Sequence, residues 1–437
     1  MTLVSPGPSI KPAPATEADP RNPIHNKFWI RPRDQVEEDL SGLRSQPLTF
    51  FPGFQFKDEL AGLRTPGAWV VPRHAPILEV SRNPRIYSSA SGVTINDFPP
   101  EFNEYFNSII SMDDPRHARL RRLVAAGFTP RMLARLEDSV QDQAKIIVDE
   151  VCERGECDFV TDVAARLPLR IVCDLMGIPD SHHDFVFDQS NIILGAADEE
   201  YVPEFGDLIT AILTAGEALS QLMDDVATSK VGVDSDDLTS ILVNAEVDGE
   251  RLTRAELASF FILLVVAGNE TTRNAISWGL VYLTDHPDQR RIWAEDFEGV
   301  AHTAVEEIVR IASPVTYMRR TALCDTVLEG TRIDEGDQVV MHYLCANRDE
   351  SVFDDPLAFD VRRDPNPHVG YGGPGPHYCL GAHLARREIK VMFRELFTRI
   401  GDIEATGDPE LLSSAFIHGI KHLPAQFTPT NPSPTHP

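Results

Sequence analysis

The sequence predicts a mainly α protein, built as a single large helical domain with small peripheral β-sheets. Three observations support this prediction. Apolar residues recur at helical spacing over long stretches of the 437-residue chain, strand patterns are few and short, and no repeat or low-complexity linker divides the chain. Hydrophobic residues make up 42% of the sequence, which is enough for one large core.

Two predicted helices organise the domain. An apolar stripe over residues 132–151 predicts the first, which Gly155 closes. The second begins at Thr253, where Thr253 and Glu256 form a capping-box pattern, and it continues towards Pro287. Apolar residues surround most of this helix, so we expect it to be buried. Strand patterns occupy Trp69 to Val71, Thr326 to Leu328 and Gln338 to His342.

Proline-rich segments lie at both ends of the chain. We predict a disordered arm over residues 1–25, the folded domain over 26–427 and a proline-rich tail over 428–437. The first residues hold no basic segment that leads into an apolar run, so we expect no secretion signal. The longest apolar stretch, Phe260 to Ala267, is far shorter than the roughly 20 residues of a membrane span. We therefore expect a cytoplasmic protein without a membrane anchor.

Charge and cysteine content narrow the class of protein. A formal charge of −27 disfavours nucleic acid and anionic membrane surfaces, so we expect no nucleic-acid partner. The six cysteines show no paired spacing, which argues against a disulfide framework and a zinc ribbon. Basic residues gather in two places, where they serve either as docking sites or as ordinary helix faces and internal contacts: Arg116, Arg119, Arg121 and Arg122, and Arg386, Arg387 and Lys390.

Cys379 is the most informative residue of the chain. It lies in a glycine-rich loop, residues 370–381, that leads directly into a predicted helix over 382–397. Glycines let a broad group approach the backbone, and a helix N-terminus favours a negative sulfur. This setting suits an anionic metal ligand. A buried core cysteine and a nucleophile are the alternatives for a lone cysteine.

The predicted buried helix contains residues that fit a helix interior poorly, Gly268, Glu270, Thr271 and Thr272. Glycine and threonine are weak helix formers, and a buried carboxylate is costly unless it has a partner or a function. The segment is therefore either a functional site or a kinked core helix with a buried Glu–Arg pair.

The motifs together resemble the cytochrome P450 superfamily. The loop pattern, aromatic-Gly-x-x-Gly-x-His-x-Cys-x-Gly followed by Ala-x-Leu-Ala-Arg-x-Glu, is similar to the haem-binding signature of that family, and Ala-Gly-x-Glu-Thr-Thr resembles its oxygen-activation motif. Tyr371 stands one residue further from Cys379 than is commonest, and Pro374 and Pro376 stiffen the loop. The resemblance covers about residues 28–427 and is strongest to the soluble actinobacterial branch that oxidises branched lipids and sterol side chains.

The resemblance implies the cytochrome P450 fold, a haem b cofactor and roles for particular residues. Cys379 would be the axial thiolate on the iron, and Glu270 and Thr271 would organise protons and water for dioxygen. Contacts to the haem are implied for His117, Arg121, Ala267, Arg320, His377 and Gly381. A network that locks the core beneath the haem is implied for Glu307, Arg310 and either Arg363 or Arg362. An apolar substrate pocket is implied for Val93, Leu263, Val315, Met318, Phe416 and Ile417.

The implied function is a haem-dependent monooxygenase that inserts one oxygen atom from O2 into a C–H bond of a hydrophobic small molecule. The branch resemblance favours terminal (ω) hydroxylation of long-chain or methyl-branched lipids, with sterol side-chain or secondary-metabolite hydroxylation as alternatives. Because the sequence contains no reductase domain, we expect a ferredoxin and a ferredoxin reductase to supply electrons. A haem-based ligand sensor and a cofactor-free helical scaffold remain as other classes of protein.

Overall fold

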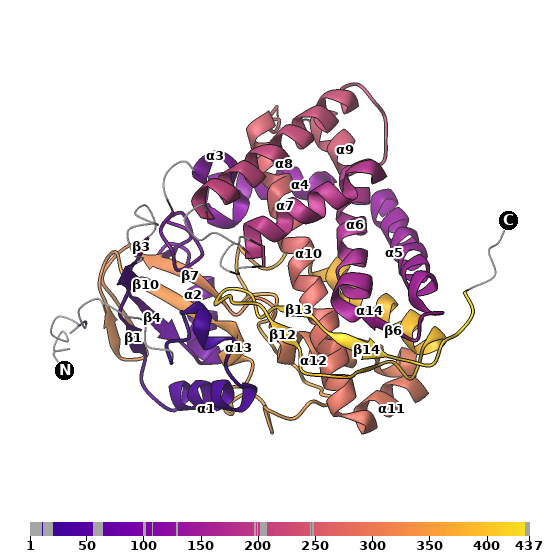
Figure 1. The fold of residues 1–437 in the computed structure, drawn as a ribbon. Helices are drawn as coiled ribbons and strands as arrows, with labels where there is room; N and C mark the ends of the chain where they lie inside the picture. Colours follow the sequence, from indigo (N-terminus) through magenta and orange to yellow (C-terminus); the bar gives the residue numbers. More distant parts are fainter. Residues whose placement is uncertain are drawn as a thin grey trace.

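The computed structural model describes residues 11, 21–55, 64–98, 102–106, 108–127, 130–195, 198, 200–201, 208–244, 246 and 249–432. Helices fill most of the molecule, and the largest sheet lies at one edge beside α1 and α2 (Figure 1). This arrangement confirms the predicted mainly α fold with small separate sheets. The helices are α1 Arg33–Arg44, α2 His74–Arg82, α3 Asn103–Phe106, α4 Arg116–Gly127, α5 Pro130–Val151, α6 Arg166–Met176, α7 His183–Gly195, α8 Leu208–Lys230, α9 Leu238–Asn244, α10 Arg254–Asp285, α11 Pro287–Glu295, α12 Phe297–Ala312, α13 Tyr343–Ala346 and α14 Ala382–Arg399.

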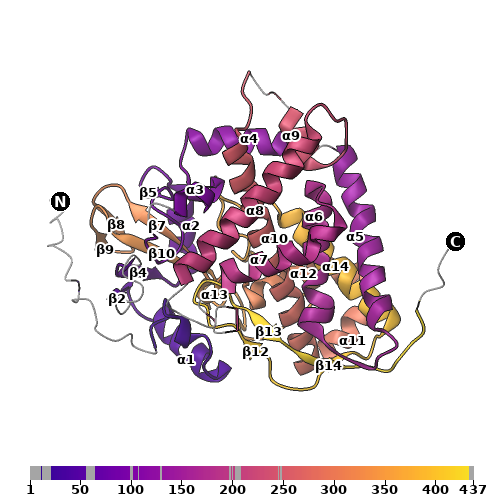
Figure 2. The same ribbon diagram turned by 45° about the horizontal axis from the view of Figure 1, so that its top comes forward.

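The axis of the fold is α10, the helix that the capping-box pattern predicts. Thr253 is its N-cap: the Thr253 hydroxyl accepts from the Glu256 N–H (3.1 Å), and the Glu256 carboxylate accepts from the Thr253 N–H (2.9 Å). α10 packs against α6, α7, α8, α12 and α14, and Figure 2 shows it passing behind α7 and α8. Among the described residues α10 is the one helix long and apolar enough to span a membrane, but most of its apolar window is buried, as in a core helix.

The other predicted long helix, residues 132–151, is α5. It contributes Val140, Ala144, Ile147 and Val148, all fully buried, to the main core cluster. Gly155 follows with a left-handed φ of 79°, which closes the segment as the sequence predicts. α5 packs on α6 and α14 and so supports the helix that follows the Cys379 loop.

The strands form one five-stranded sheet and four smaller pairings. In the large sheet the order is β1 Thr49–Phe51, β4 Ala68–Val71, β10 Gln338–His342, β7 Tyr317–Ala322 and β5 Tyr87–Ser88. The smaller sheets are β11 Glu404–Ala405, β14 Pro424–Gln426 and β6 Glu156–Asp158; β12 Glu410–Leu411 and β13 Ile420–His422; β2 Phe54–Gln55 and β3 Arg64–Thr65; and β8 Thr326–Leu328 and β9 Thr331–Ile333. The three predicted strands are confirmed as parts of β4, β8 and β10.

Strand β7 was not predicted from the sequence, and it matters for the site. It pairs antiparallel with β10, so that Arg320 lies opposite Val339, and every residue of β10 is buried. Because β10 is hydrogen-bonded on both sides, it holds β7 and the arginines of β7 in a fixed position.

Contacts at the chain ends extend beyond the predicted domain boundaries. Of the predicted arm 1–25, residues 1–10 and 12–20 lie outside the described residues, as do 433–437 of the tail. Ile24 is fully buried in a core cluster, and Lys11 pairs with Asp334 (3.2 Å). Near the other end, the Thr430 N–H donates to the Cys152 carbonyl (2.8 Å). These residues therefore pack against the domain.

Candidate cofactor and catalytic site

Cys379 lies at the end of the glycine-rich loop, just before Gly381, the N-cap of α14. The Cys379 N–H donates to the Tyr371 carbonyl (3.0 Å), which closes the loop on itself. Gly372 has a φ of 86°, a conformation that side chains strongly disfavour. A side chain at Gly375 would collide with the Ser81 carbonyl of α2. The glycines therefore serve a tight loop that sits directly on α2.

The Cys379 side chain is exposed, although burial is the largest influence on its acidity and raises the pKa of its thiol. The Gly381 N–H, Arg121 and Arg386 lower this pKa but do not outweigh burial. The Gly381 N–H at the start of α14 favours the anionic sulfur, as predicted, but the loss of water costs the charged form more. The thiol is thus accessible although protein surrounds it, and a bound metal cation would deprotonate it.

One face of α10 is also open in the middle of the molecule. Ala267 is exposed, and Leu263 and Thr271, four residues before and after it, are partly exposed. Val265 and Asn269, on other faces of the same turns, are fully buried. The Thr271 hydroxyl donates to the Ala267 carbonyl (2.6 Å), as expected for a threonine within a helix. This accessible stripe has the shape that a flat group lying against the helix would cover.

The structure brings His117, Arg121, Arg320 and His377 together. The imidazole rings of His117 and His377 are 4.3 Å apart, and Arg121 Nη2 donates to the carbonyl of Tyr378, the residue before Cys379 (2.7 Å). Burial, together with the charges of Arg320, His117 and Arg121, lowers the pKa of His377 to about 3, so its imidazole is neutral. These residues come from α4, β7 and the cysteine loop.

This cluster has unused hydrogen-bond donors. His117 Nε2 is buried and has no hydrogen-bond partner among the described residues. Arg320 is 5% exposed, and within the described part of the chain its side chain forms one hydrogen bond, to the Arg319 carbonyl (2.7 Å). Burial lowers the pKa of Arg320, since Asp113 and Tyr343 offset the loss of water only in part. Donors of this kind fit the carboxylates of a haem beside a cysteine ligand, so the residues present fit this cofactor.

Glu270 and Thr271 lie in different surroundings. Glu270 is 1% exposed and forms an ion pair with Arg273, while Asn274 Nδ2 donates to Glu270 Oε2 (3.3 Å). Arg273 Nη1 also donates to Asn191 Oδ1 on α7 (3.2 Å). The structure thus contains the buried Glu–Arg pair that the sequence offers as an alternative, and Arg273, at i,i+3 spacing, is the arginine. The carboxylate is therefore tied into a buried polar network, whereas the Thr271 hydroxyl lies on the open face.

Glu307 and Arg310 are fully buried, and the third member of their network is Arg363, whose side chain is 11% exposed. Glu307 accepts from Arg310 Nε (2.7 Å) and Nη2 (2.8 Å), and from Arg363 Nε (3.1 Å to each oxygen). Arg362 is exposed. Burial would raise the pKa of Glu307, but Arg310 and Arg363 outweigh it, and the pKa is lowered. Arg310 also donates to the carbonyls of Asn347 (2.8 Å) and Ala358 (3.0 Å), which ties the loop after α13 to α12.

The apolar residues predicted for the pocket meet in part. Val315 and Ile417 form an isolated β-bridge, and the Thr316 N–H donates to the Phe416 carbonyl (3.0 Å). The Val93 carbonyl accepts from the Arg319 N–H (2.7 Å), which places Val93 against β7 near Met318. Leu263 lies on the open face of α10. Backbone contacts thus connect five of these six residues through β7 and the 416–417 segment, whereas Leu263 lies apart from them on α10.

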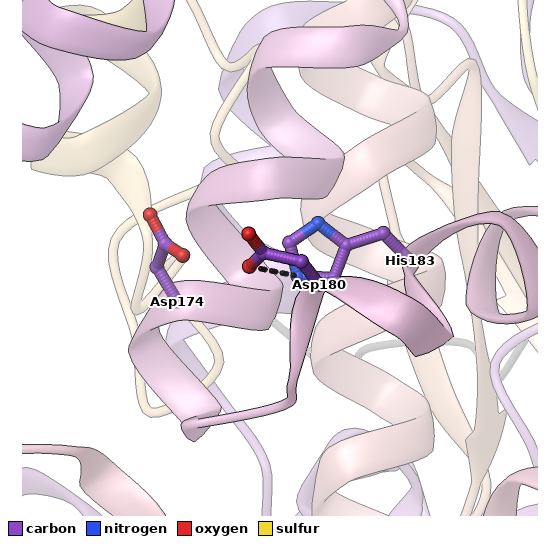
Figure 3. Close-up of side chains that lie close together, drawn as sticks. All are labelled: Asp174, Asp180 and His183. Atoms are coloured by element: carbon purple, nitrogen blue, oxygen red, sulfur yellow. Dashed lines mark ion pairs between the residues drawn. The ribbon is translucent and has the colours of Figure 1, made fainter.

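A separate group of possible metal ligands lies at the corner between α6 and α7. Figure 3 shows Asp174, Asp180 and His183, with an ion pair between Asp180 Oδ1 and His183 Nε2 (3.8 Å). Asp174 accepts from the Ser139 hydroxyl (2.7 Å), and His183 Nε2 is 3.4 Å from the Ile178 carbonyl. Asp180 is exposed, so these contacts account for the group as a helix–helix junction.

Glu388 is a buried carboxylate on α14 that the sequence analysis left without a role. It is 3% exposed, and its Oε2 has no hydrogen-bond partner among the described residues. Burial raises the pKa of Glu388 to about 8. Its position was detectable, because Glu388 lies midway between Leu384 and Met392 on the apolar face of the predicted helix.

The sequence is similar to known proteins along most of its length. The sequence profile of the family described as cytochrome P450 matches residues 217–400. A methyl-branched lipid omega-hydroxylase of Mycobacterium tuberculosis is 47% identical over 405 residues, which cover 92% of this chain and 93% of that protein. A steroid C26-monooxygenase of Mycolicibacterium smegmatis is 37% identical over 399 residues, 90% of each chain.

Solved structures resemble the whole chain. A cytochrome P450 of Mycobacterium marinum in complex with pseudoionone has a TM-score of 0.87 and 40% identity, and the match covers 96% of this chain and 100% of that chain. A cytochrome P450 of the bacillaene polyketide synthase of Bacillus subtilis has a TM-score of 0.81 and 28% identity, over 94% of this chain and 100% of that chain.

The acidity of Glu388 predicts a specific pH dependence of stability. The folded protein holds this proton up to about pH 8, whereas an unfolded chain releases it near the ordinary glutamate pKa of 4.5. Unfolding therefore releases a proton between these values, and this residue makes the free energy of unfolding fall as pH rises, by at most about 1.4 kcal/mol per unit. Urea unfolding at several pH values should show a flatter profile for Glu388→Gln than for the wild type.

The matched control is Glu395→Gln on the same helix, where Glu395 accepts from Gln141 (2.6 Å). The free energy of unfolding of Glu395→Gln should depend on pH as steeply as that of the wild type. Equal slopes for Glu388→Gln and the wild type would contradict the buried, protonated carboxyl.

Proposed function

Because the chain belongs to the cytochrome P450 family, whose members carry haem with a cysteine thiolate on the iron, we propose that Cys379 is that thiolate. The observation that carries this proposal is an accessible thiol at the end of the glycine-rich loop, with His117, Arg121, Arg320 and His377 gathered beside it. The chain is a haem-dependent monooxygenase, and bound haem supplies the electron-transfer and O2 chemistry of the reaction.

We propose that the four basic side chains and Gly381 position the cofactor. Arg320 and His117 have unused donors for its carboxylates, and Arg121 anchors the cysteine loop through the Tyr378 carbonyl. Ala267 leaves the open face of α10 without a bulky side chain, so that the flat ring can approach the helix. The Glu307–Arg310–Arg363 network fixes the segment that leads into the loop.

Thr271 and Glu270 are proposed to deliver protons. The Thr271 hydroxyl donates to Ala267 and keeps its oxygen lone pairs for a water on the open face. Glu270 is the residue before Thr271, and Arg273 and Asn274 hold its carboxylate. It can exchange a proton with water when the ion pair with Arg273 opens. A haem-based sensor would have no use for such a relay, which favours an enzyme.

The substrate is proposed to be a long-chain or methyl-branched lipid that is hydroxylated at its terminal carbon. The predicted pocket residues are all apolar, and the relative that is 47% identical is named a methyl-branched lipid omega-hydroxylase. Oxidation of a steroid side chain is the second candidate, because the 37% identical relative is named a steroid C26-monooxygenase. We propose that the reaction takes place in the cytoplasm.

Product analysis tests the substrate proposal. The haem-loaded protein, supplied with NADH, a ferredoxin and its reductase, should convert a methyl-branched fatty acid to the product with a terminal hydroxyl, because an apolar channel admits the tail of the lipid first. Mass spectrometry of the products gives the position of the oxygen. A parallel reaction with a sterol that retains its side chain tests the second candidate, and oxidation only at mid-chain positions would contradict terminal selectivity.

Thr271→Ala should uncouple electron use from product formation. Without the hydroxyl, protons reach bound oxygen from disordered water, so the product formed per NADH should fall several-fold and peroxide should rise. Haem content and substrate affinity should stay at the wild-type level. Thr271→Ser should restore coupling, and Thr272→Ala serves as the control, because Thr272 is 4% exposed and lies off the open face. Full coupling in Thr271→Ala would show that this residue does not guide protons.

A ferredoxin is proposed to dock near α14, and the structure narrows the basic residues that can meet it. Lys390 pairs with Glu298 (2.9 Å), and Arg386 pairs with Glu306 (2.9 Å). Arg387 forms no ion pair with any residue in the described part of the chain, so its charge is available to an acidic partner.

Arg387→Glu should therefore slow reduction by the ferredoxin, by roughly tenfold at low salt and less at high salt. Stopped-flow absorbance measures this rate. Arg251→Glu, which makes the same charge change at an exposed residue before α10, is the control and should reduce at the wild-type rate. Identical rates for Arg387→Glu and the wild type at low salt would remove this docking position.

A further inference from the structure

Glu306, the residue before Glu307 on α12, connects both ends of the cysteine loop. His368 Nε2, which lies before the loop, is 2.9 Å from Glu306 Oε2, and Arg386 Nη2, which lies after it on α14, donates to the same oxygen (2.9 Å). Arg386 Nε donates to the other oxygen, Oε1 (2.5 Å). The side chain of Glu306 is 13% exposed, so these contacts are largely shielded from water.

Arg386 brings this contact close to the sulfur. Its guanidinium lies over the ring of Tyr371, 4.2 Å from the ring centroid, and the Tyr371 carbonyl accepts from the Cys379 N–H (3.0 Å). Arg386 is therefore a cation close to the cysteine, because it stacks on the residue whose carbonyl holds the Cys379 N–H.

Glu306 is ionised throughout the ordinary pH range. Burial would raise the pKa of its carboxyl, but His368 and Arg386 outweigh burial and lower this pKa to about 2. A full negative charge is therefore in contact with Arg386. The field of Arg386 at Cys379 is reduced by the field of Glu306, since the two opposite charges are in contact.

We propose that Glu306 is a positioning residue that fixes the cysteine loop at both ends and, by neutralising Arg386, sets the positive charge that the Cys379 sulfur experiences. This inference rests on the proposed function, in which that sulfur binds haem iron. A net positive charge near the iron favours uptake of an electron, so the pair controls how readily the haem is reduced.

Charge tuning and a purely structural contact give different results for two single substitutions. Glu306→Gln keeps the shape of the side chain and leaves Arg386 uncompensated, so the reduction potential should rise. Arg386→Gln removes the positive charge, so the potential should fall. A contact that only holds the loop would be weakened in both variants, and both potentials would then shift in the same direction.

Potentiometric titration of the haem-loaded, full-length protein measures these shifts. The ratio of reduced to oxidised haem at a fixed potential should change on the order of tenfold, upward for Glu306→Gln and downward for Arg386→Gln. Glu298→Gln is the matched control, because Glu298 lies on the same helix and pairs with Lys390 (2.9 Å) and Arg394 of α14. It should titrate as the wild type does. Shifts of the same sign, or a Glu306→Gln that titrates like Glu298→Gln, would overturn the proposal.

The double variant Glu306→Gln/Arg386→Gln keeps the test decisive if Glu306→Gln does not fold. It removes both charges, so its potential should lie near that of the wild type and above that of Arg386→Gln. Equal potentials for the double variant and Arg386→Gln would refute a charge effect of Glu306. A wild-type protein whose absorption spectrum lacks the signature of thiolate ligation would contradict both the proposed function and this inference. A thiolate-ligated protein in which Glu306→Gln leaves the reduction potential unchanged would contradict the inference alone.

Discussion

The protein packed around the Cys379 sulfur is the constraint on which the rest of the site depends. Although the side chain is exposed, this packing favours the neutral thiol, and the Gly381 N–H, Arg121 and Arg386 only partly offset the preference. Iron supplies the missing positive charge when haem is bound. The glycine loop, the basic residues on three separate elements and the open face of α10 are then requirements of one task, which is to hold a broad anionic cofactor against a single sulfur.

Consecutive glutamates on α12 give this sulfur a rigid support. Glu307 is fully buried and joins Arg310 and Arg363, whereas Glu306 reaches the two ends of the cysteine loop. Breaking a buried ion pair by removal of one partner costs about 3–5 kcal/mol, because the other charge is left without compensation. α12 therefore anchors the loop through charges that cannot rearrange at low cost. The same helix thus contributes both to stability and to the electrostatics of the site.

Periodicity and motif order allowed much of the fold and site to be predicted, and the family assignment agrees with the predicted resemblance. The apolar periodicity of the sequence predicts α5 and α10, and the spacing of Thr253 and Glu256 predicts the capping box. β7 could not be predicted, because its two central arginines are buried only through pairing with β10 and β5. Arg363 could be distinguished from Arg362 only in three dimensions, where Glu307 accepts from it. Glu306 likewise gains its partners from distant segments, and the direction of the Cys379 pKa shift depends on burial depth, which local sequence does not encode.

The central claim is that the sulfur of Cys379 binds the iron. The most direct measurement is the absorption spectrum of the purified, haem-loaded protein after reduction and exposure to carbon monoxide, recorded for the wild type and for Cys379→Ser. Thiolate ligation predicts a strongly red-shifted Soret band in the wild type and the loss of that band in Cys379→Ser. A wild type that lacks the band, or a Cys379→Ser protein that retains it, would contradict the account.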